Sequence, residues 1–379
     1  MEQVQISRVS SDLLYLLRCA ARDMQPEEAR VADMDMQALY DLAKCHSLSA
    51  LTAVTLERCG VSDEQWRQAK GNALRRAVLM DAERKAICDF LDSIGCWYLP
   101  MKGVLIQELY PRLGTREMSD NDILFDAAYQ DAVHTFMETR GYTTDSIGAG
   151  HHDSYSKPPV FHFEMHTSLV TEMTNPVWCA YYQDVRSRLL PCGGKTHALR
   201  FSDEDFYIYF QIHGCKHYRH AGNGIRSLLD IYFYLRAKEA SMDWDYIHRE
   251  CRDLGIEAYE QRMRTLSYKL FGSETPALTQ EEQKDLAYML SSGTYGTALN
   301  RMQNTLRKIQ ASGELSVVTK LRYLLGRIFP DRAFMAVYCA PVRFRLWMYP
   351  FVWIYRFFKI IFLRTGVLVG ELKLLWRGK

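Results

Sequence analysis

Residues 98–125, YLPMKGVLIQELYPRLGTREMSDNDILF, decide the fold. The stretch begins with a short, aromatic, β-prone run, and Lys102 and Gly103 then lead into an amphipathic helical run that Pro111 ends. A second β-prone run follows around Asp122. This order predicts a strand, a turn, a short helix and another strand, which is the beginning of a small α+β core.

Three carboxylates in this region have the spacing of a metal site. Asp120 and Asp122 are two residues apart, and on a strand this spacing points both side chains to the same face of the sheet. In residues 160–166, VFHFEMH, strict alternation puts Glu164 and His166 on one face, so Glu164 is the expected third ligand. Phosphoryl and nucleotidyl transfer use such clusters to hold two divalent cations about 4 Å apart. With oxygen ligands, Mg²⁺ is the expected ion and Mn²⁺ the second choice.

Basic residues around the carboxylates are interpreted as phosphate ligands. Lys102 and Gly103 stand where a strand turns into a helix, so backbone N–H groups can bind phosphate there and the lysine adds a positive charge. Arg116 can hold the leaving phosphates through bidentate contacts. Arg226 has two open interpretations: it faces the nucleotide across the cleft, or it forms an ion pair with Asp230, four residues later on a helix.

The chain contains eleven histidines, and several of them fall near the predicted site. His166 is interpreted as a neighbour that orients a carboxylate by hydrogen bonding. His213 and His217 are one helical turn apart, a spacing that can bind zinc, although no HExxH motif accompanies them. The favoured interpretation is that these two residues, with His151 and His152, line the cleft wall or form hydrogen bonds.

Helical periodicity extends on both sides of this core. Apolar residues recur at helical spacing from Ser10 to about Leu91, and the pattern returns to helix after Arg200. The sequence therefore predicts an α+β protein with a small sheet flanked by helical domains. The predicted domains are an N-terminal helical domain (1–92), a catalytic core (93–200), a helical domain closing the cleft (201–325) and a basic, aromatic helical tail (326–379).

Residues 98–125, the FEMH of residues 163–166 and the GIRSLLDIY of residues 224–232 together resemble the uncharacterised nucleotidyltransferase family of bacteria, within the polymerase-beta-like superfamily. Members typically show KG, R-x-M-x-D-x-D and [E/D]-x-H in this order. The resemblance extends from the N-terminal helices to about Arg301. It implies a small mixed sheet with flanking helices, and Mg²⁺-dependent transfer of a nucleoside monophosphate with release of pyrophosphate. One departure is Val104, because the superfamily commonly has Gly-Ser or Gly-Gly at the phosphate turn.

Composition restricts the classes of protein to which this chain can belong. A net charge of +2, from 47 basic and 45 acidic residues, argues against a protein that coats nucleic acid. Ten cysteines without a CxxC pair, and an N-terminus without a signal-peptide pattern, predict a cytoplasmic protein with reduced thiols. Residues 342–379 are strongly basic, but their longest uncharged run is ten residues, which is too short to span a bilayer. This tail is expected to pack on the body, with an interfacial membrane helix as the alternative.

The leading hypothesis is a nucleotidyltransferase. An NTP with Mg²⁺ binds between the sheet and residues 202–238, Asp120, Asp122 and Glu164 hold the ions, and Glu164 accepts the proton of an acceptor hydroxyl. The acceptor is a small molecule, a protein or RNA. Two rivals stay open: a catalytically weak nucleotide-binding sensor or scaffold, motivated by Val104, and a peripheral membrane protein that docks through its tail.

Overall fold

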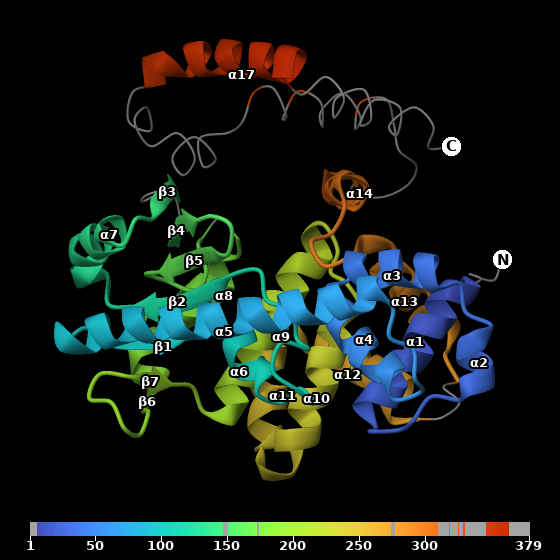
Figure 1. Cartoon of the computed structure of the whole chain (residues 1–379). Helices are drawn as coiled ribbons and strands as arrows, with labels where there is room; N and C mark the ends of the chain where they lie inside the picture. Colours follow the sequence, from blue (N-terminus) through green and yellow to red (C-terminus); the bar gives the residue numbers. More distant parts are fainter. Residues whose placement is uncertain are drawn as a thin grey trace.

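The computed structural model describes residues 6–146, 151–172, 174–273, 277–309, 318, 325, 329 and 346–363 (Figure 1). Its N-terminal part is helical, as predicted, and consists of α1 (Arg8–Ala21), α2 (Glu28–Ala32), α3 (Met36–Cys45), α4 (Ser49–Glu57) and α5 (Glu64–Ser93). Ser7 and Asp35 cap α1 and α3, because their side-chain oxygens accept hydrogen bonds from backbone N–H groups in the first turn.

Helix α5 connects two hydrophobic cores. Trp66, near its start, is buried in the core shared by the N-terminal and later helices, whereas Ile87 and Leu91 are buried in the core beneath the sheet. Figure 1 shows α5 crossing from the helical part of the molecule to the strands. One rigid helix therefore links the two parts, and the domain boundaries at residues 92/93, 200/201 and 325/326 stay predictions.

The sheet contains β1 (Tyr98–Pro100), β2 (Asn121–Phe125), β3 (Thr143–Ser146), β4 (His152–Lys157) and β5 (Phe161–His166) in the order β1-β2-β5-β4-β3. Strands β2 and β5 are parallel and the other neighbours are antiparallel, so the sheet is mixed and the α+β prediction is confirmed. The sequence predicts β1, β2 and β5. It does not predict β3 and β4, because TTDS and HDSYSK are too polar to show a hydrophobic alternation.

Shorter elements surround the sheet: α6 (Gly103–Gln107), η1 (Ala127–Tyr129), α7 (Gln130–Thr139), α8 (Pro176–Tyr181), η2 (Val185–Arg188), β6 (Leu190–Pro191) and β7 (Leu199–Arg200). Strand alternation gives the sheet one apolar face and one polar face. The apolar side chains join the core with α5 and α7: Ile123, Phe125, Phe163 and Met165. Asp122, Glu164 and His166 alternate with them and therefore lie on the opposite face.

The C-terminal helices are α9 (Asp203–His220), α10 (Arg226–Lys238), η3 (Glu239–Ser241), α11 (Trp244–Asp253), α12 (Glu257–Gly272), α13 (Gln280–Ser292) and α14 (Ala298–Ile309). Helices α9 and α10 face the polar side of the sheet across a cleft, and α10 and α12 pack on the N-terminal helix α1. Side-chain oxygens cap two of the C-terminal helices: Ser202 accepts a hydrogen bond at the start of α9, and Asp243 does so at the start of α11. Gly255 follows α11 with a φ of 66°, a conformation that favours glycine.

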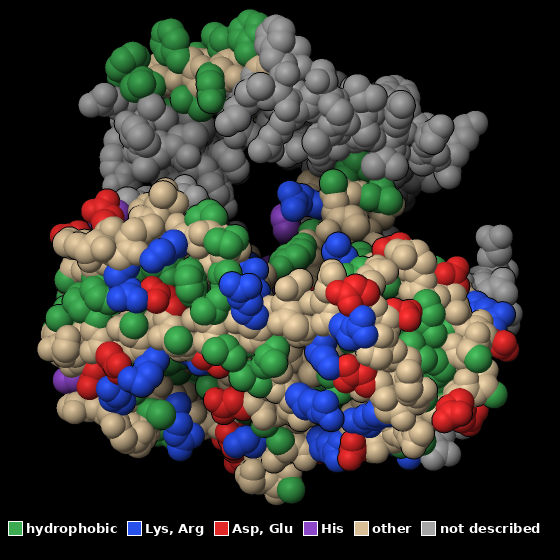
Figure 2. All heavy atoms as spheres, viewed as in Figure 1, with side chains coloured by type: hydrophobic (Ala, Val, Ile, Leu, Met, Phe, Trp, Pro, Cys, Tyr) green, Lys and Arg blue, Asp and Glu red, His purple; other side chains and the backbone are tan. Residues whose placement is uncertain are grey.

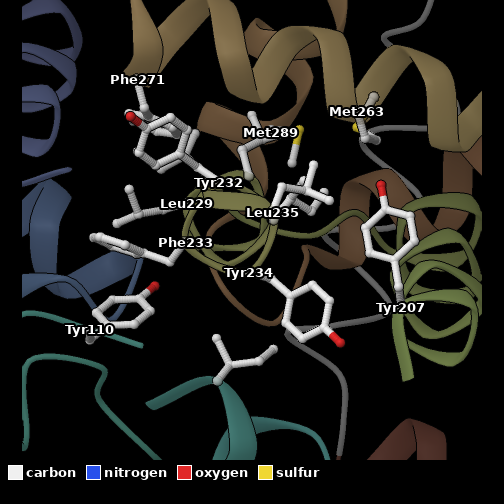
Figure 3. Close-up of a cluster of buried hydrophobic side chains, with 14 of the residues drawn as sticks. Tyr110, Tyr207, Leu229, Tyr232, Phe233, Tyr234, Leu235, Met263, Phe271 and Met289 are labelled. Carbon is white, nitrogen blue, oxygen red and sulfur yellow. The ribbon is translucent and has the colours of Figure 1, made fainter. Parts of the chain in front are cut away.

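Helix α10 lies at the centre of the larger core (Figure 3). Its side chains Leu229, Phe233 and Leu235 are buried, and the Phe233 ring lies 4.5 Å from that of Tyr110, which follows α6. This packing fixes the segment after α6 against α10. It thereby sets the distance between the two sides of the polar cleft.

The described part of the tail consists of η5 (Leu346–Met348) and α17 (Tyr349–Leu363). Figure 2 shows hydrophobic side chains gathered on α17, and Trp347 and Phe351 are exposed. Among the described helices, none combines the length and the apolar character needed to cross a membrane. The predictions for residues 330–345 and 364–379 lie outside the described residues.

Candidate functional site

Strand register brings Asp122 beside Glu164. In the parallel pair of β2 and β5, Asp122 is the partner of Glu164, and Leu124 is the partner of His166. The ligand atoms of Asp122, Glu164 and His166 lie within 4.8 Å of one another, which is close enough to hold one metal ion. The structure therefore places the predicted third carboxylate on the adjacent strand. It also places His166 among the atoms able to bind the metal directly.

Asp122 is the electrostatic centre of this group. Lys102 Nζ donates to Asp122 Oδ1 at 2.6 Å, and His166 Nε2 lies 2.8 Å from the same oxygen. Burial opposes the charge on Asp122, but Lys102 and His166 outweigh it and hold the pKa of Asp122 well below its usual range. Burial also opposes the charge on Lys102, yet Asp122 raises the pKa of that lysine. Both groups are therefore charged at neutral pH.

Asp120 lines the same cleft, but it does not lie on the strand that was predicted to carry it. Strand β2 begins at Asn121, so Asp120 precedes the strand, and the argument from strand alternation does not apply to it. Asp120 is half-buried, lines the cleft and accepts a hydrogen bond from Ser119. Burial, and then repulsion from Asp122, raise the pKa of Asp120. Within the described part of the chain, it is not among the residues whose ligand atoms approach within 4.8 Å of one another.

The turn between β1 and α6 has an unusual backbone. Lys102 has a φ of 54°, a left-handed conformation that is costly for a residue with a Cβ and is typical of functional sites. Both Lys102 and Gly103 line the cleft, as predicted. A Cβ on Gly103 would lie 2.4 Å from Arg116 Nη1 and 2.7 Å from Met118 Sδ. Glycine is therefore required here by the packing of two side chains, a reason the sequence does not reveal.

Arg116 lines the cleft, and its guanidinium is bound to other side chains of the protein. Its Nε and Nη2 donate to the two carboxylate oxygens of Asp230, each at 2.8 Å, and Tyr110 Oη donates to Asp230 at 2.7 Å. In this structure the guanidinium makes its bidentate contact to a protein carboxylate. An Arg226–Asp230 ion pair, the other interpretation offered by the sequence, is not what the structure shows, because Asp230 binds Arg116.

The opposite wall of the cleft comes from α9 and α10. Arg226 lines the cleft, and its Nη1 donates to the backbone carbonyl of Glu117 at 2.7 Å. His213 and His217 also line it, with their Nε2 atoms 3.1 Å apart. The cleft has a volume of about 340 Å³, at the lower end of the roughly 300–1,000 Å³ found for small-ligand sites.

Lys216 is the cleft residue that the sequence analysis misses. It lies on α9 between the two histidines and lines the cleft. Burial, and then the nearby Lys102, lower the pKa of Lys216. Its position beside two histidines one helical turn apart is the signal that could identify it, because the face of α9 that carries them closes the cleft. Its ammonium adds a cation to those of Lys102, Arg116 and Arg226 in the cleft lining.

Clustered carboxylates on a small mixed sheet, faced by basic side chains across a cleft, define a class of enzymes that transfer phosphorus-containing groups. The chain belongs to the family described as uncharacterised nucleotidyltransferases, whose model matches residues 32–272. That match includes all the candidate site residues. No curated protein and no solved structure matches the chain.

Proposed function

We propose that the protein is a Mg²⁺-dependent nucleotidyltransferase that moves a nucleoside monophosphate from an NTP to a hydroxyl of its acceptor. The observation that carries this proposal is the register of β2 and β5, which sets Asp122 beside Glu164 in a cleft lined by basic residues. Membership of the nucleotidyltransferase family supports it. The acceptor carries a hydroxyl group and belongs to one of the three predicted classes.

The donor set fits a divalent cation. Asp122, Glu164 and His166 offer ligand atoms within 4.8 Å of one another, and Asp120 lines the same cleft. Mg²⁺ prefers oxygen ligands and usually binds only a few protein side chains, so Asp120, Asp122 and Glu164 would hold it. Mn²⁺ is the alternative, and it accepts a nitrogen ligand such as His166 more readily. When bound, the ion neutralises charge on the triphosphate and lowers the pKa of the attacking hydroxyl.

The basic residues of the cleft would bind the phosphates. Lys216 and Arg226 project from the helices opposite the carboxylates, and Lys102 projects from the turn before α6. In the resting structure Lys102 is paired with Asp122, so it can exchange this partner for a phosphate oxygen when the nucleotide enters. Arg116 holds this wall in place through Asp230 rather than binding phosphate.

Asp120 and Glu164 differ in their pKa before an ion binds. His166 and Lys102 overcome the effect of burial and lower the pKa of Glu164, whereas burial and Asp122 raise the pKa of Asp120. Glu164 would accept the proton of the acceptor hydroxyl, the role that the sequence predicts for it.

The nucleotide-binding sensor is the second candidate, and one observation favours it. Val104 is 4% exposed and does not line the cleft, so no side chain at that position takes the place of the hydroxyl contact to phosphate. A protein that binds NTP tightly but releases no pyrophosphate would match this alternative. The two candidates differ in turnover and agree in nucleotide binding.

The deciding experiment measures pyrophosphate release from each of the four NTPs with Mg²⁺, with lysate fractions as the source of acceptor. Asp120→Asn is the test variant, because Asp120 is half-buried and, among the described residues, its side chain is hydrogen-bonded to Ser119 alone. Losing several kcal/mol of transition-state stabilisation would slow transfer by roughly 10³-fold without unfolding the chain. Asp131→Asn, exposed on α7, is the matched control and should behave as wild type. Wild-type transfer by Asp120→Asn would refute the assignment.

A further inference from the structure

Three histidines converge beside the carboxylates. The antiparallel register of β4 and β5 pairs His152 directly with His166, and His151 immediately precedes β4. One nitrogen of each ring lies within 4.8 Å of the others. The ring centroids are 4.6 Å apart for His151 and His152, 5.4 Å for His151 and His166, and 4.8 Å for His152 and His166. Three imidazoles at these distances can share one cation.

On two of these rings one nitrogen lies near a carboxylate and the other has no hydrogen-bond partner among the described residues. His166 Nε2 lies 2.8 Å from Asp122 Oδ1 and 3.3 Å from Glu164 Oε2, and His152 Nε2 lies 3.7 Å from Glu164 Oε1. The Nδ1 atoms of both histidines are buried, and no described residue forms a hydrogen bond with them. Metal-binding histidines use this arrangement, because a carboxylate that holds one ring N–H leaves the lone pair on the other nitrogen.

The free nitrogen of His166 is the strongest sign of a missing partner. This side chain is 1% exposed, and an unsatisfied buried polar atom costs about 1–3 kcal/mol. A bound cation removes that cost. Asp122 does not satisfy this nitrogen, because Asp122 contacts the Nε2 side of the ring.

We propose that His151, His152 and His166 form a site for a divalent transition-metal ion, Zn²⁺ before others, separate from the Mg²⁺ held by the carboxylates. Imidazole nitrogens suit Zn²⁺, and three protein ligands leave one position for water or for an oxygen of a bound ligand. His151 and His152 line the cleft, so a molecule in the cleft can supply that fourth donor. This site does not depend on the proposed transfer activity.

The rival location for such an ion is the group of Asp122, Glu164 and His166, which shares one histidine with the proposed site. The two locations differ in chemistry. Mg²⁺ competes well for a site rich in carboxylates but poorly for three imidazoles. Competition by Mg²⁺, combined with substitution of His151 and His152, which belong to the histidine group alone, therefore separates them.

The test uses the full chain, stripped of metal by a chelator and dialysed, and titrated calorimetrically with Zn²⁺ in the presence of excess Mg²⁺. One equivalent of Zn²⁺ should bind. His151→Gln and His152→Gln should each weaken that binding by at least the roughly 10–100-fold that loss of an outer-shell partner costs. His162→Gln is the matched control, because His162 lies on the same strand as His166 but hydrogen-bonds to Ser156. Its affinity should equal that of wild type.

Co²⁺ supplies a second measurement that does not involve activity. An ion bound by three imidazoles and one further ligand should show the intense visible bands of tetrahedral Co²⁺, and His151→Gln should lose them. Circular dichroism verifies that each variant is folded. Displacement of Zn²⁺ by excess Mg²⁺, or wild-type affinity in both His151→Gln and His152→Gln, would place the ion on the carboxylates and overturn the proposal.

Discussion

The buried ion pair between Arg116 and Asp230 supports a quantitative prediction that also tests the role of Arg116. The two side chains are only 8% and 4% exposed, and two hydrogen bonds of 2.8 Å join them. Removing one partner leaves a buried charge without compensation, which costs about 3–5 kcal/mol. Asp230→Leu also leaves the Tyr110 hydroxyl without its acceptor, for about 1–3 kcal/mol more.

The measurement is a double-mutant cycle of Arg116→Met, Asp230→Leu and the double variant, with unfolding in urea followed by circular dichroism. Each single variant should lose at least about 3 kcal/mol of unfolding free energy. The double variant should lose clearly less than the sum, because no unpaired charge is then buried. Arg67→Met is the control, since the Arg67–Glu64 pair on α5 is more than half exposed and such pairs contribute at most about 1 kcal/mol.

The affinity of these variants for NTP tests whether Arg116 also contacts phosphate. If Arg116 only holds the cleft wall, the folded double variant should bind NTP with an affinity close to that of wild type. A tenfold loss of NTP affinity in a double variant of normal stability would show that Arg116 contacts phosphate, as its sequence position suggests. A loss of less than 1 kcal/mol in both single variants would refute the structural role.

Two further predictions concern stability. Burial lowers the pKa of His46 to about 4, below the usual value near 6.5, so the unfolded chain takes up the proton first. As the pH falls from 6.5 to 4, His46 should therefore lower the unfolding free energy by up to roughly 3 kcal/mol. Urea unfolding of His46→Gln at several pH values should show a weaker dependence on pH. An unchanged dependence would contradict the lowered pKa of His46. Gly103→Ala should cost about 1–3 kcal/mol in thermal unfolding, because the added Cβ meets the locked Arg116. Gly71→Ala, with open space on α5, should instead stabilise by about 1 kcal/mol, and equal effects at both positions would refute the steric argument.

Local patterns in the sequence determine much of the fold. The two-residue period of a strand places Glu164 and His166 on one face of β5, and the structure agrees. Ser202 and Asp243 mark helix starts because a side-chain oxygen satisfies a backbone N–H within three residues. These features depend on neighbours close in the chain. The sequence therefore indicates them directly, together with the family resemblance that residues 98–125 carry.

Strands β3 and β4 could not be predicted, because their pairing and not their composition makes them strands. Residues 152–157 are mostly polar, yet they add to the edge of β5 along its whole length. Backbone hydrogen bonding to a preformed neighbour compensates for weak intrinsic preference. The histidine group that includes His152 therefore emerges only once this strand is in place.

Tertiary structure decided which side chains meet in the candidate site. Asp122 meets Glu164 through the register of β2 and β5, and a shift of one residue would point one of them into the apolar core. Arg116 binds Asp230 across 114 residues of chain, a partner that its position in the motif does not reveal. Lys216 reaches the cleft because α9 lies over the polar face. The sequence by itself indicated most of the candidate site residues, since residue type and short spacing are local properties. Only long-range packing decided which of them meet, and it added Lys216 to the cleft.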